Sequence, residues 1–408
     1  MAITLITTPL DIVPAYNPII ITAESDMLAE INFRYVIDVI ITYPVNATKT
    51  VKMSPRPDGF LLFDAHRIIE NYLSYDFNIG EETDSYSCPN SYVAYQLDIY
   101  EEYGDPIATY SGESINGYAI NSAVKHSVAS FGTEPALLNL DLQGDYMMAD
   151  NVFNADKPFL TSSPRTLKIC SDENYYLYAV LNLSNEPPDL MLSVYDEAGG
   201  LLGTEIKNLT GTDKILRYGV GTKNINEWNA AYLVGASYYT VQLYGTYLGT
   251  PTPISELFTF NIDCDCSKYN EKFRLHWLNP LGGFDAFTFN QRFDRTLNIK
   301  KSNYTKILGA VDSVGAFTFE TSQAGKVNFN TISNELVKIN SEWITEEECN
   351  WLFTAVKSSQ VFWEINSTTY APVVVINNTY QQKTYAGEKL FNLELTIEIS
   401  NEIISQRQ

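Results

Sequence analysis

The sequence predicts a mainly β protein made of tandem β-sandwich domains followed by a C-terminal α+β domain. The 408 residues are too many for one ordinary domain and suit two or three. The 28 Tyr and 20 Phe accompany many Val, Ile and Thr, which are residue types that favour strands. Apolar and polar residues alternate with a period of two in many segments, and Gly, Asn, Asp or Pro separate these segments.

Three domains are expected. Residues 1–160 form an N-terminal β-sandwich with a short helix near 65–74 in this interpretation. Residues 161–264 match an immunoglobulin-like or fibronectin-like sandwich in length. Residues 265–408 form the α+β domain, with a helix near 346–357.

The first domain shows strand patterns and one helix signal. Asp64 can accept hydrogen bonds from the unpaired N–H groups of a helix that begins near Ala65. The apolar residues that would share one face of this helix are Ile68, Ile69, Tyr72 and Leu73. The segments with strand character are 33–42, 50–53, 91–100 and 107–110.

The second domain has a hairpin signal at 196–200, where Asp-Glu-Ala-Gly-Gly separates two apolar runs. Its expected strands are 175–183, 190–195 and 237–244. Tyrosines in the last of these strands are expected to pack on the sheet, although a carbohydrate-binding platform would use similar aromatic residues.

The third domain combines an aromatic hairpin with a well-defined helix. Strands are expected at 273–278 and 285–293 around the turn Asn-Pro-Leu-Gly-Gly at 279–283, where Pro fixes φ and Gly permits positive φ. Thr345 with Glu348 three residues later forms a capping box at a helix start. Cys349, Leu352, Phe353 and Val356 then follow at helical spacing, and residues 391–400 alternate as a strand.

The charge of the chain is strongly negative and unevenly distributed. Residues 1–264 carry 13 basic and 33 acidic side chains, whereas residues 265–408 carry 14 and 16. A pI near 4.5 makes direct binding of nucleic acid unlikely, because that affinity depends on Lys and Arg. Solvated acidic loops are one explanation of the asymmetry, and different partners at the two ends are the other.

One basic cluster interrupts this acidity, and it is the candidate interaction site. It consists of Arg292, Arg295, Lys300, Lys301 and Lys306. The cluster could dock the acidic front of a second copy, which gives a head-to-tail contact that closes into a ring when the rotation permits.

The sequence gives no sign of secretion, a membrane span or a metal site. The first 21 residues lack a basic start and contain three prolines, which argues against a signal peptide. No run approaches 18 uncharged apolar residues. The five cysteines are odd in number and widely spaced, so we expect reduced thiols in a cytoplasm. Cys264 and Cys266 lack a second ligand pair for zinc.

Catalytic motifs are absent from the sequence, and we expect neither enzymatic activity nor a cofactor. The three histidines, His66, His126 and His276, are interpreted as packing or hydrogen-bonding residues. No phosphate-binding loop or nucleophile elbow occurs. The acidic pairs 81–82 and 101–102 could serve glycoside hydrolysis only if they faced another carboxylate across a cleft.

Several motifs resemble a group of virion proteins in the tail modules of tailed bacteriophages that infect Bacteroidetes, including crAss-like phages. They lie in the first and third segments of the chain. The motifs are PAYNPI (14–19), DGF (58–60), FDAHRIIENYLSYD (63–76), LHWLNPLGGFD (275–285), WITEEE (343–348) and residues 400–407. The resemblance implies a non-enzymatic part of the neck, tail or baseplate, present in multiple copies and assembled in the host cytoplasm.

Three functions remain open at this level. The first is a structural virion protein that forms a ring with itself and contacts other tail, neck or portal-proximal proteins. Here the apolar stretch 3–21 and the tail 400–408 are candidates for arms that reach neighbours. The second is a receptor-binding or glycan-binding tail-tip module. The third is a glycan depolymerase, for which the sequence offers only unpaired acids.

Overall fold

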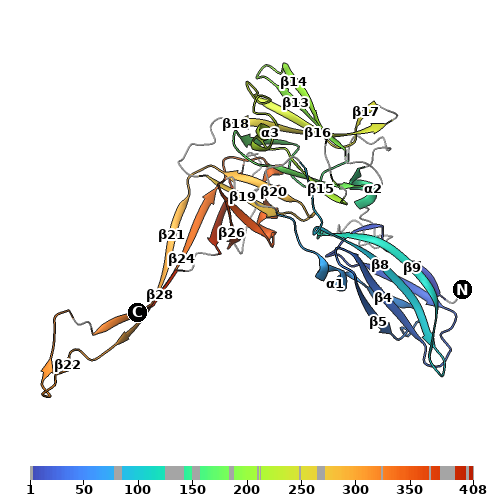
Figure 1. The fold of residues 1–408 in the computed structure, drawn as a ribbon, viewed down its shortest axis with the longest axis horizontal. Helices are drawn as coiled ribbons and strands as arrows, with labels where there is room; N and C mark the ends of the chain where they lie inside the picture. Colours follow the sequence, from blue (N-terminus) through green and yellow to red (C-terminus); the bar gives the residue numbers. More distant parts are fainter. Residues whose placement is uncertain are drawn as a thin grey trace. The chain divides into compact units, whose positions relative to one another are not determined.

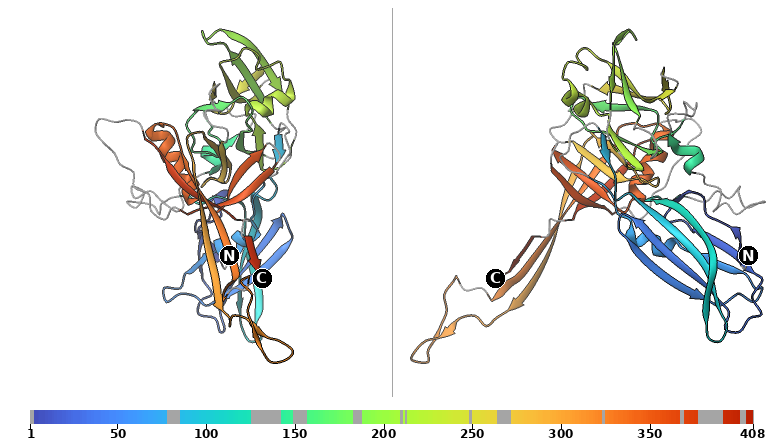
Figure 2. Two further views of the ribbon diagram at one scale, coloured as in Figure 1. Left: turned by 90° about the vertical axis from the view of Figure 1, so that its left-hand side faces the viewer. Right: turned by 45° about the vertical axis from the view of Figure 1, so that its right-hand side comes forward.

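The structure is a computed structural model, and its described residues form a mainly β fold (Figures 1 and 2). The chain divides into two compact units, Met1–Asp265 with Leu278–Asp285, and Cys266–Trp277 with Ala286–Gln408. The described residues are 3–77, 85–124, 142–148, 157–182, 188–208, 211, 213–247, 250–263, 272–322, 325–366, 369–376, 391–400 and 404–407.

The first unit begins with a β-sandwich, whose two sheets share one apolar core. Ile21 and Leu61 from the smaller sheet lie in this core with Tyr35 and Leu97 from the larger sheet. The smaller sheet contains β1 (Ile3–Thr7), β3 (Ile20–Ser25) and β6 (Leu61–Asp64), in that order. The larger sheet has the order β2 (Ile12–Pro14), β9 (Ala108–Ile120), β8 (Tyr92–Tyr103), β4 (Arg34–Tyr43) and β5 (Ala47–Met53).

A short helical segment follows β6, at the place where the sequence predicts a helix. It consists of α1 (His66–Ile69) and a 3-10 turn, η1 (Glu70–Tyr72). Asp64 Oδ1 accepts hydrogen bonds from the backbone N–H of His66 at 3.1 Å and of Ile19 at 2.9 Å. The Asp64 carboxylate therefore binds the first N–H group of the helix and also the backbone N–H of the segment before β3.

The N-terminal stretch 3–21 is part of this sandwich and is not an arm. Ile3, Ile12 and Ile21 are at most 3% exposed, and β2 pairs in parallel with β9. The apolar residues of this stretch therefore pack in the protein's own core, where burial removes their side chains from water.

A second β-sandwich completes the first unit. Tyr175 packs edge-on against Phe260 at 5.4 Å, and the Tyr239 hydroxyl donates to the Val220 carbonyl at 2.8 Å. One sheet has the order β10 (Met147–Met148), β12 (Tyr176–Leu181), β15 (Ile215–Gly219) and β7 (Ser85–Ser87). The other has the order β11 (Thr166–Cys170), β18 (Phe258–Asp263), β16 (Tyr238–Tyr247), β13 (Asp189–Tyr195) and β14 (Leu201–Lys207), with β17 (Thr250–Pro253) on β16.

The predicted hairpin at 196–200 joins β13 to β14. Asp196 N donates to Gly200 O at 3.0 Å, and Gly199 has a φ of 82°. Two short helices of this unit, α2 (Leu142–Tyr146) and α3 (Thr222–Trp228), were not predicted. Both are shorter than the window of about 11 residues over which a helical periodicity can be recognised in a sequence.

The expectation of reduced thiols is wrong at one cysteine. Cys170 is disulfide-bonded, to a partner outside the described residues, whereas Cys88 and Cys349 are free and buried. The parallel pairing of β11 with β18 places Cys170 opposite Asp263, the last described residue before Cys264. Spacing along the sequence could not reveal that Cys170 is bonded, because it does not fix which cysteines pair.

The described residues of the second unit form an eight-stranded sheet, a small two-stranded sheet and one helix, α4 (Glu346–Lys357), as expected for an α+β domain. The indole rings of Trp277 and Trp351 pack at 5.3 Å between sheet and helix, and Trp277 Nε1 donates to Thr354 Oγ1 at 2.8 Å. The strand order is β20 (Phe284–Phe289), β19 (Phe273–Leu278), β25 (Val361–Asn366), β26 (Thr369–Val375), β27 (Glu394–Ile399), β24 (Lys326–Asn340) and β21 (Asp294–Thr305), with β28 (Ile404–Arg407) on β24.

Helix α4 has the capping box that the sequence predicts. Glu348 N donates to Thr345 Oγ1 at 3.2 Å, and Thr345 N donates to Glu348 Oε2 at 2.8 Å. The buried side of the helix is formed by Cys349, Trp351, Leu352 and Ala355, while Phe353 and Val356 are only half-buried. The predicted apolar face is therefore rotated toward Trp351, because this indole finds Trp277 as its partner.

Thr345→Ala removes the side-chain acceptor at the start of α4. We expect the free energy of unfolding of the second unit to fall by about 1 kcal/mol, the usual effect of losing a Thr N-cap. Urea denaturation followed by tryptophan fluorescence measures this change. Thr345→Ser retains the acceptor and should remain close to wild type; equal losses in both variants would contradict the capping role.

Candidate interaction surface

The feature that stands out in the second unit is a long β-hairpin that extends away from its own sheet. We call it the arm and define it as residues 292–340, from two residues before β21 to the end of β24 (Figure 1). All 12 residues of β21 are exposed, and only Val337 and Ile339 of β24 are buried. Most of the arm is therefore not covered by the rest of the described chain.

Two exposed apolar side chains of β21, Leu297 and Ile299, lie on the face of the hairpin that is buried at its base. Directly opposite residues of an antiparallel pair share a face, and Leu297 and Ile299 lie opposite Glu335 and Ser333. Val337, two residues before Ile339 on β24, belongs to the same face because side chains alternate along a strand. This face of the hairpin is thus buried at the base of the arm, at Val337 and Ile339, and exposed farther out, where Leu297 is 58% exposed.

The far end of the arm is also apolar. Here β22 (Ala310–Val311) pairs with β23 (Phe317–Thr318), around a turn in which Asp312 Oδ1 accepts from Ala316 N at 2.8 Å. Val314 at this turn is 84% exposed. The large apolar residues of the arm that are exposed are Leu297, Ile299, Tyr304, Ile307, Leu308, Val311, Val314, Phe317, Phe319 and Phe329. Such a concentration marks an interaction surface.

The outer edge of the arm is a second unpaired feature. β21 ends the strand order of its sheet, so its backbone N–H and C=O groups on one side have no partner strand among the described residues. A long exposed edge strand is a template on which another chain can add a strand.

The structure brings all five residues of the predicted basic cluster to the arm. Arg295 forms an ion pair with Glu335 at 3.2 Å, and Arg292 forms one with Asp294 at 3.4 Å. Lys300 and Lys301 are neighbours on β21 and therefore lie on opposite faces. The cluster is thus a property of the whole hairpin and not of one face, and its role in binding remains a prediction.

Sequence reasoning missed the apolar tip residues, which are the most exposed part of this surface. The available signal was the segment 307–319, where Ile, Leu, Val and Phe recur without the regular alternation of a half-buried strand. Of the tail 400–408, the other predicted arm, the described residues 404–407 form β28, which pairs with β24 and has Ser405 opposite Ile332.

The structure describes two histidines, His66 and His276, and each lies beside a carboxylate. His276 Nε2 lies 2.7 Å from Glu364 Oε2, and Arg274 Nε lies 3.4 Å from the same oxygen. All three side chains are at most 8% exposed, so a substrate would not reach them. His66 Nδ1 lies 2.8 Å from Asp64 Oδ1 beside α1. His126 lies outside the described residues.

Of the two acidic pairs, 81–82 lies outside the described residues, and 101–102 does not form a catalytic dyad. Glu102 is paired with Lys52 Nζ at 2.6 Å. Glu101 is fully buried in the first sandwich, and its carboxyl oxygens have no hydrogen-bond partner of good geometry among the described residues. Burial raises the pKa of the Glu101 carboxyl, and the nearby Ser25 hydroxyl, which favours the charged form, does not reverse this shift.

The described ranges contain no group of three or more His, Cys, Asp or Glu side chains placed to hold a metal ion. Cys264 and Cys266 lie outside them. No helix among the described residues is both long and apolar enough to cross a membrane.

No known protein family and no curated protein matches this chain. Among solved structures, it is similar to a tetra-tandem repeat in the extending region of a large adhesion protein, with 10% identity and a TM-score of 0.22 over 83% of this chain and 69% of the other. It is also similar to the FN1-FN3 domains of chicken CNTN1, with 8% identity and a TM-score of 0.16 over 63% and 64%. These scores are too low to support a functional argument.

Glu101→Gln replaces the buried carboxyl with a neutral group of the same shape. Because the pKa of Glu101 is higher in the folded state, its contribution to stability is complete at acid pH and is lost as pH rises through that pKa. We therefore expect the variant to be more stable than wild type at pH 7, by about 1–3 kcal/mol, and nearly equal at pH 4. Thermal melts at both pH values measure this difference.

Glu102→Gln is the matched control, because it removes the neighbouring charge together with its ion pair to Lys52. It should not stabilise the protein at pH 7. A stabilisation by Glu101→Gln that persists unchanged at pH 4 would show that the effect does not come from ionisation of this carboxyl.

Proposed function

We propose that this chain is a non-enzymatic structural component of a bacteriophage virion. In this proposal it forms a multi-copy ring in the neck, tail or baseplate and connects adjacent tail components. The observation that carries the assembly part is the arm, whose apolar face and tip are exposed. The virion part rests on the resemblance of the sequence motifs to tail-module proteins of phages that infect Bacteroidetes.

The physical argument for assembly begins with the stability of the arm. The outer part of the arm, beyond the pairing of β24 with β28, is two-stranded, and a two-stranded hairpin is at best marginally stable on its own in water. Removing apolar surface from water contributes roughly 25 cal/mol per Å². A partner that covers Leu297, Ile299 and the tip residues would therefore stabilise both the hairpin and the complex.

We propose a second copy of the chain as this partner. The arm carries seven basic and four acidic side chains, whereas residues 1–264 carry 13 basic and 33 acidic ones. Opposite charge on two different surfaces of the same chain favours a head-to-tail contact. Contacts of this kind repeat from copy to copy and close into a ring when the rotation between copies permits.

The partners and location follow from the same proposal. The ring contacts unlike tail, neck or portal-proximal proteins and is assembled in the host cytoplasm before it becomes part of the particle. Direct contact with DNA is not included, because the chain has a formal charge of −22.

The double variant Leu297→Asp with Ile299→Asp places two charges on the apolar face of the arm. Purified wild-type protein should be oligomeric at micromolar concentration, and the variant should shift to monomer, because buried unpaired carboxylates are strongly unfavourable. Mass photometry and light scattering after size exclusion measure the distribution. A monomeric wild type, or an oligomer unaffected by the variant, would remove the support for assembly through the arm.

Leu201→Asp with Leu202→Asp is the matched control. Both leucines are exposed on strand β14 of the first unit, as the arm residues are on β21. The control variant should retain the wild-type distribution, which separates loss of the arm contact from a general effect of added charge.

Reversing the charge of Arg292, Arg295, Lys300, Lys301 and Lys306 tests the electrostatic part. The variant should associate more weakly and its association should depend less on salt than that of wild type, because screening acts on exposed charges. Mass spectrometry of purified particles tests the virion part separately: absence of the chain from finished phage contradicts that part even when the isolated protein forms rings.

A further inference from the structure

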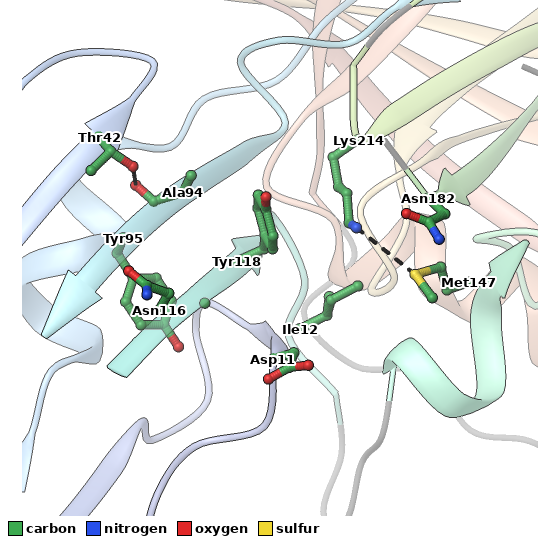
Figure 3. Close-up of a pocket in the computed structure, with 11 residues that line it drawn as sticks. Asp11, Ile12, Thr42, Ala94, Tyr95, Asn116, Tyr118, Met147, Asn182 and Lys214 are labelled. Atoms are coloured by element: carbon green, nitrogen blue, oxygen red, sulfur yellow. Dashed lines mark hydrogen bonds between the residues drawn. The ribbon is translucent and has the colours of Figure 1, made fainter. Parts of the chain in front are cut away.

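The first unit contains a cavity of about 630 Å³ that neither the arm nor the proposed assembly uses (Figure 3). Strands of both sandwiches in this unit contribute to it. Its lining includes Tyr118, Asn116 and Gly117 on β9, Tyr95 on β8, Ile12 on β2, Met147 on β10, and Lys214 directly before β15.

Lys214 is the only basic residue of this lining, and it is 7% exposed. Its backbone is fixed because the Lys214 carbonyl accepts a hydrogen bond from Leu181 N at 2.8 Å. The side chain extends toward Met147, whose Sδ lies 3.8 Å from Nζ, and Nζ lies 4.7 Å from the centroid of the Tyr118 ring (Figure 3).

No carboxylate of a described residue lies within 4.0 Å of Lys214 Nζ, so this buried ammonium has only weak partners. Burial lowers the pKa of Lys214, and the negative charge of Asp11 opposes that shift from a greater distance. A buried charge without a paired counter-charge is unfavourable. An anion in the cavity would supply the missing partner.

A second polar group of the lining is also unused. The Tyr95 hydroxyl is buried and has no hydrogen-bond partner among the described residues. A side chain at position 117 would collide with it, since a Cβ there would lie 2.6 Å from the hydroxyl oxygen. Glycine at this position therefore leaves room for the Tyr95 ring and its hydroxyl.

The remaining polar lining consists of hydrogen-bonding groups on several sides. Asn116 and Asn182 offer amide groups, and Asp11 offers an acceptor between the Tyr95 side and the Lys214 side of the cavity (Figure 3). One ammonium and one carboxylate, that of Asp11, lie among uncharged donors and acceptors, and this lining matches a ligand with an acidic group beside Lys214 and several hydroxyls, which can donate to Asp11.

We propose that this cavity binds a small sugar acid, with the carboxylate of the ligand on Lys214 and its hydroxyls on the surrounding amide, hydroxyl and carboxylate groups. The volume is within the range of small-molecule sites and suits one or two sugar rings. This binding goes beyond the proposed structural role and does not depend on it, because the arm belongs to the other unit.

The test is titration of the full-length protein with sodium D-glucuronate and D-galacturonate by isothermal calorimetry, with D-glucose and acetate as comparison ligands. At least one sugar acid should bind saturably and at least tenfold more tightly than glucose or acetate. Failure of both acids to bind overturns the proposal. Equal affinity for acetate overturns the assignment of a sugar acid.

Lys214→Met should weaken binding of the sugar acid at least tenfold. Lys207→Met is the matched control, because Lys207 also lies over an aromatic ring, that of Trp228 at 4.7 Å, outside the cavity lining. The control should bind as wild type does. Unchanged binding in Lys214→Met overturns the proposal.

Met147→Glu is a second variant that remains informative if Lys214→Met fails to fold. It places a carboxylate beside Lys214 and should abolish binding of the acid by occupying the ammonium. One further result would also overturn the proposal: no sugar acid binds to wild type, but Lys214→Met changes the oligomeric state. This result would indicate that an acidic side chain of another copy occupies the cavity.

Discussion

The structure depends on one constraint: every apolar face of a β-sheet must be covered by another apolar layer. In the first unit, Ile21 and Leu61 on one sheet cover Tyr35 and Leu97 on the other. In the second unit, α4 covers part of the large sheet through the contact of Trp351 with Trp277. The arm is where this constraint is not met, because the face that contains Val337 and Ile339 continues outward through Leu297 and Ile299 without a described covering layer.

This difference gives the two units different physical roles. The first unit contains a cavity lined by Lys214, so the ligand that suits it is small and charged. The second unit presents a long surface that is both apolar and basic, so the partner that suits it is a protein surface of opposite charge. The proposed ring and the proposed sugar-acid site therefore rest on separate observations in separate units.

Local elements were predictable where the signal lies within a few residues. The capping box of Thr345 and Glu348 is present with both hydrogen bonds, and the turn at 279–283 has Gly282 at a φ of 97°. The interaction site was predictable only in part: the basic residues of the arm were named, whereas the exposed tip at Val314 was not. Whether an apolar residue is covered depends on segments distant in sequence, so composition cannot distinguish a core residue from a docking residue.

By itself, the sequence determined the fold class, the position of most strands and the start of α4, because alternation, turn chemistry and capping act between neighbouring residues. The tertiary structure alone decided three things. It placed Ile3 to Ile21 in a core and not in an arm, it extended β21 and β24 beyond their sheet, and it buried Lys214 without a carboxylate partner among the described residues. Each of these results depends on long-range strand pairing, which sets exposure and electrostatic environment and leaves no mark in the local pattern of residues.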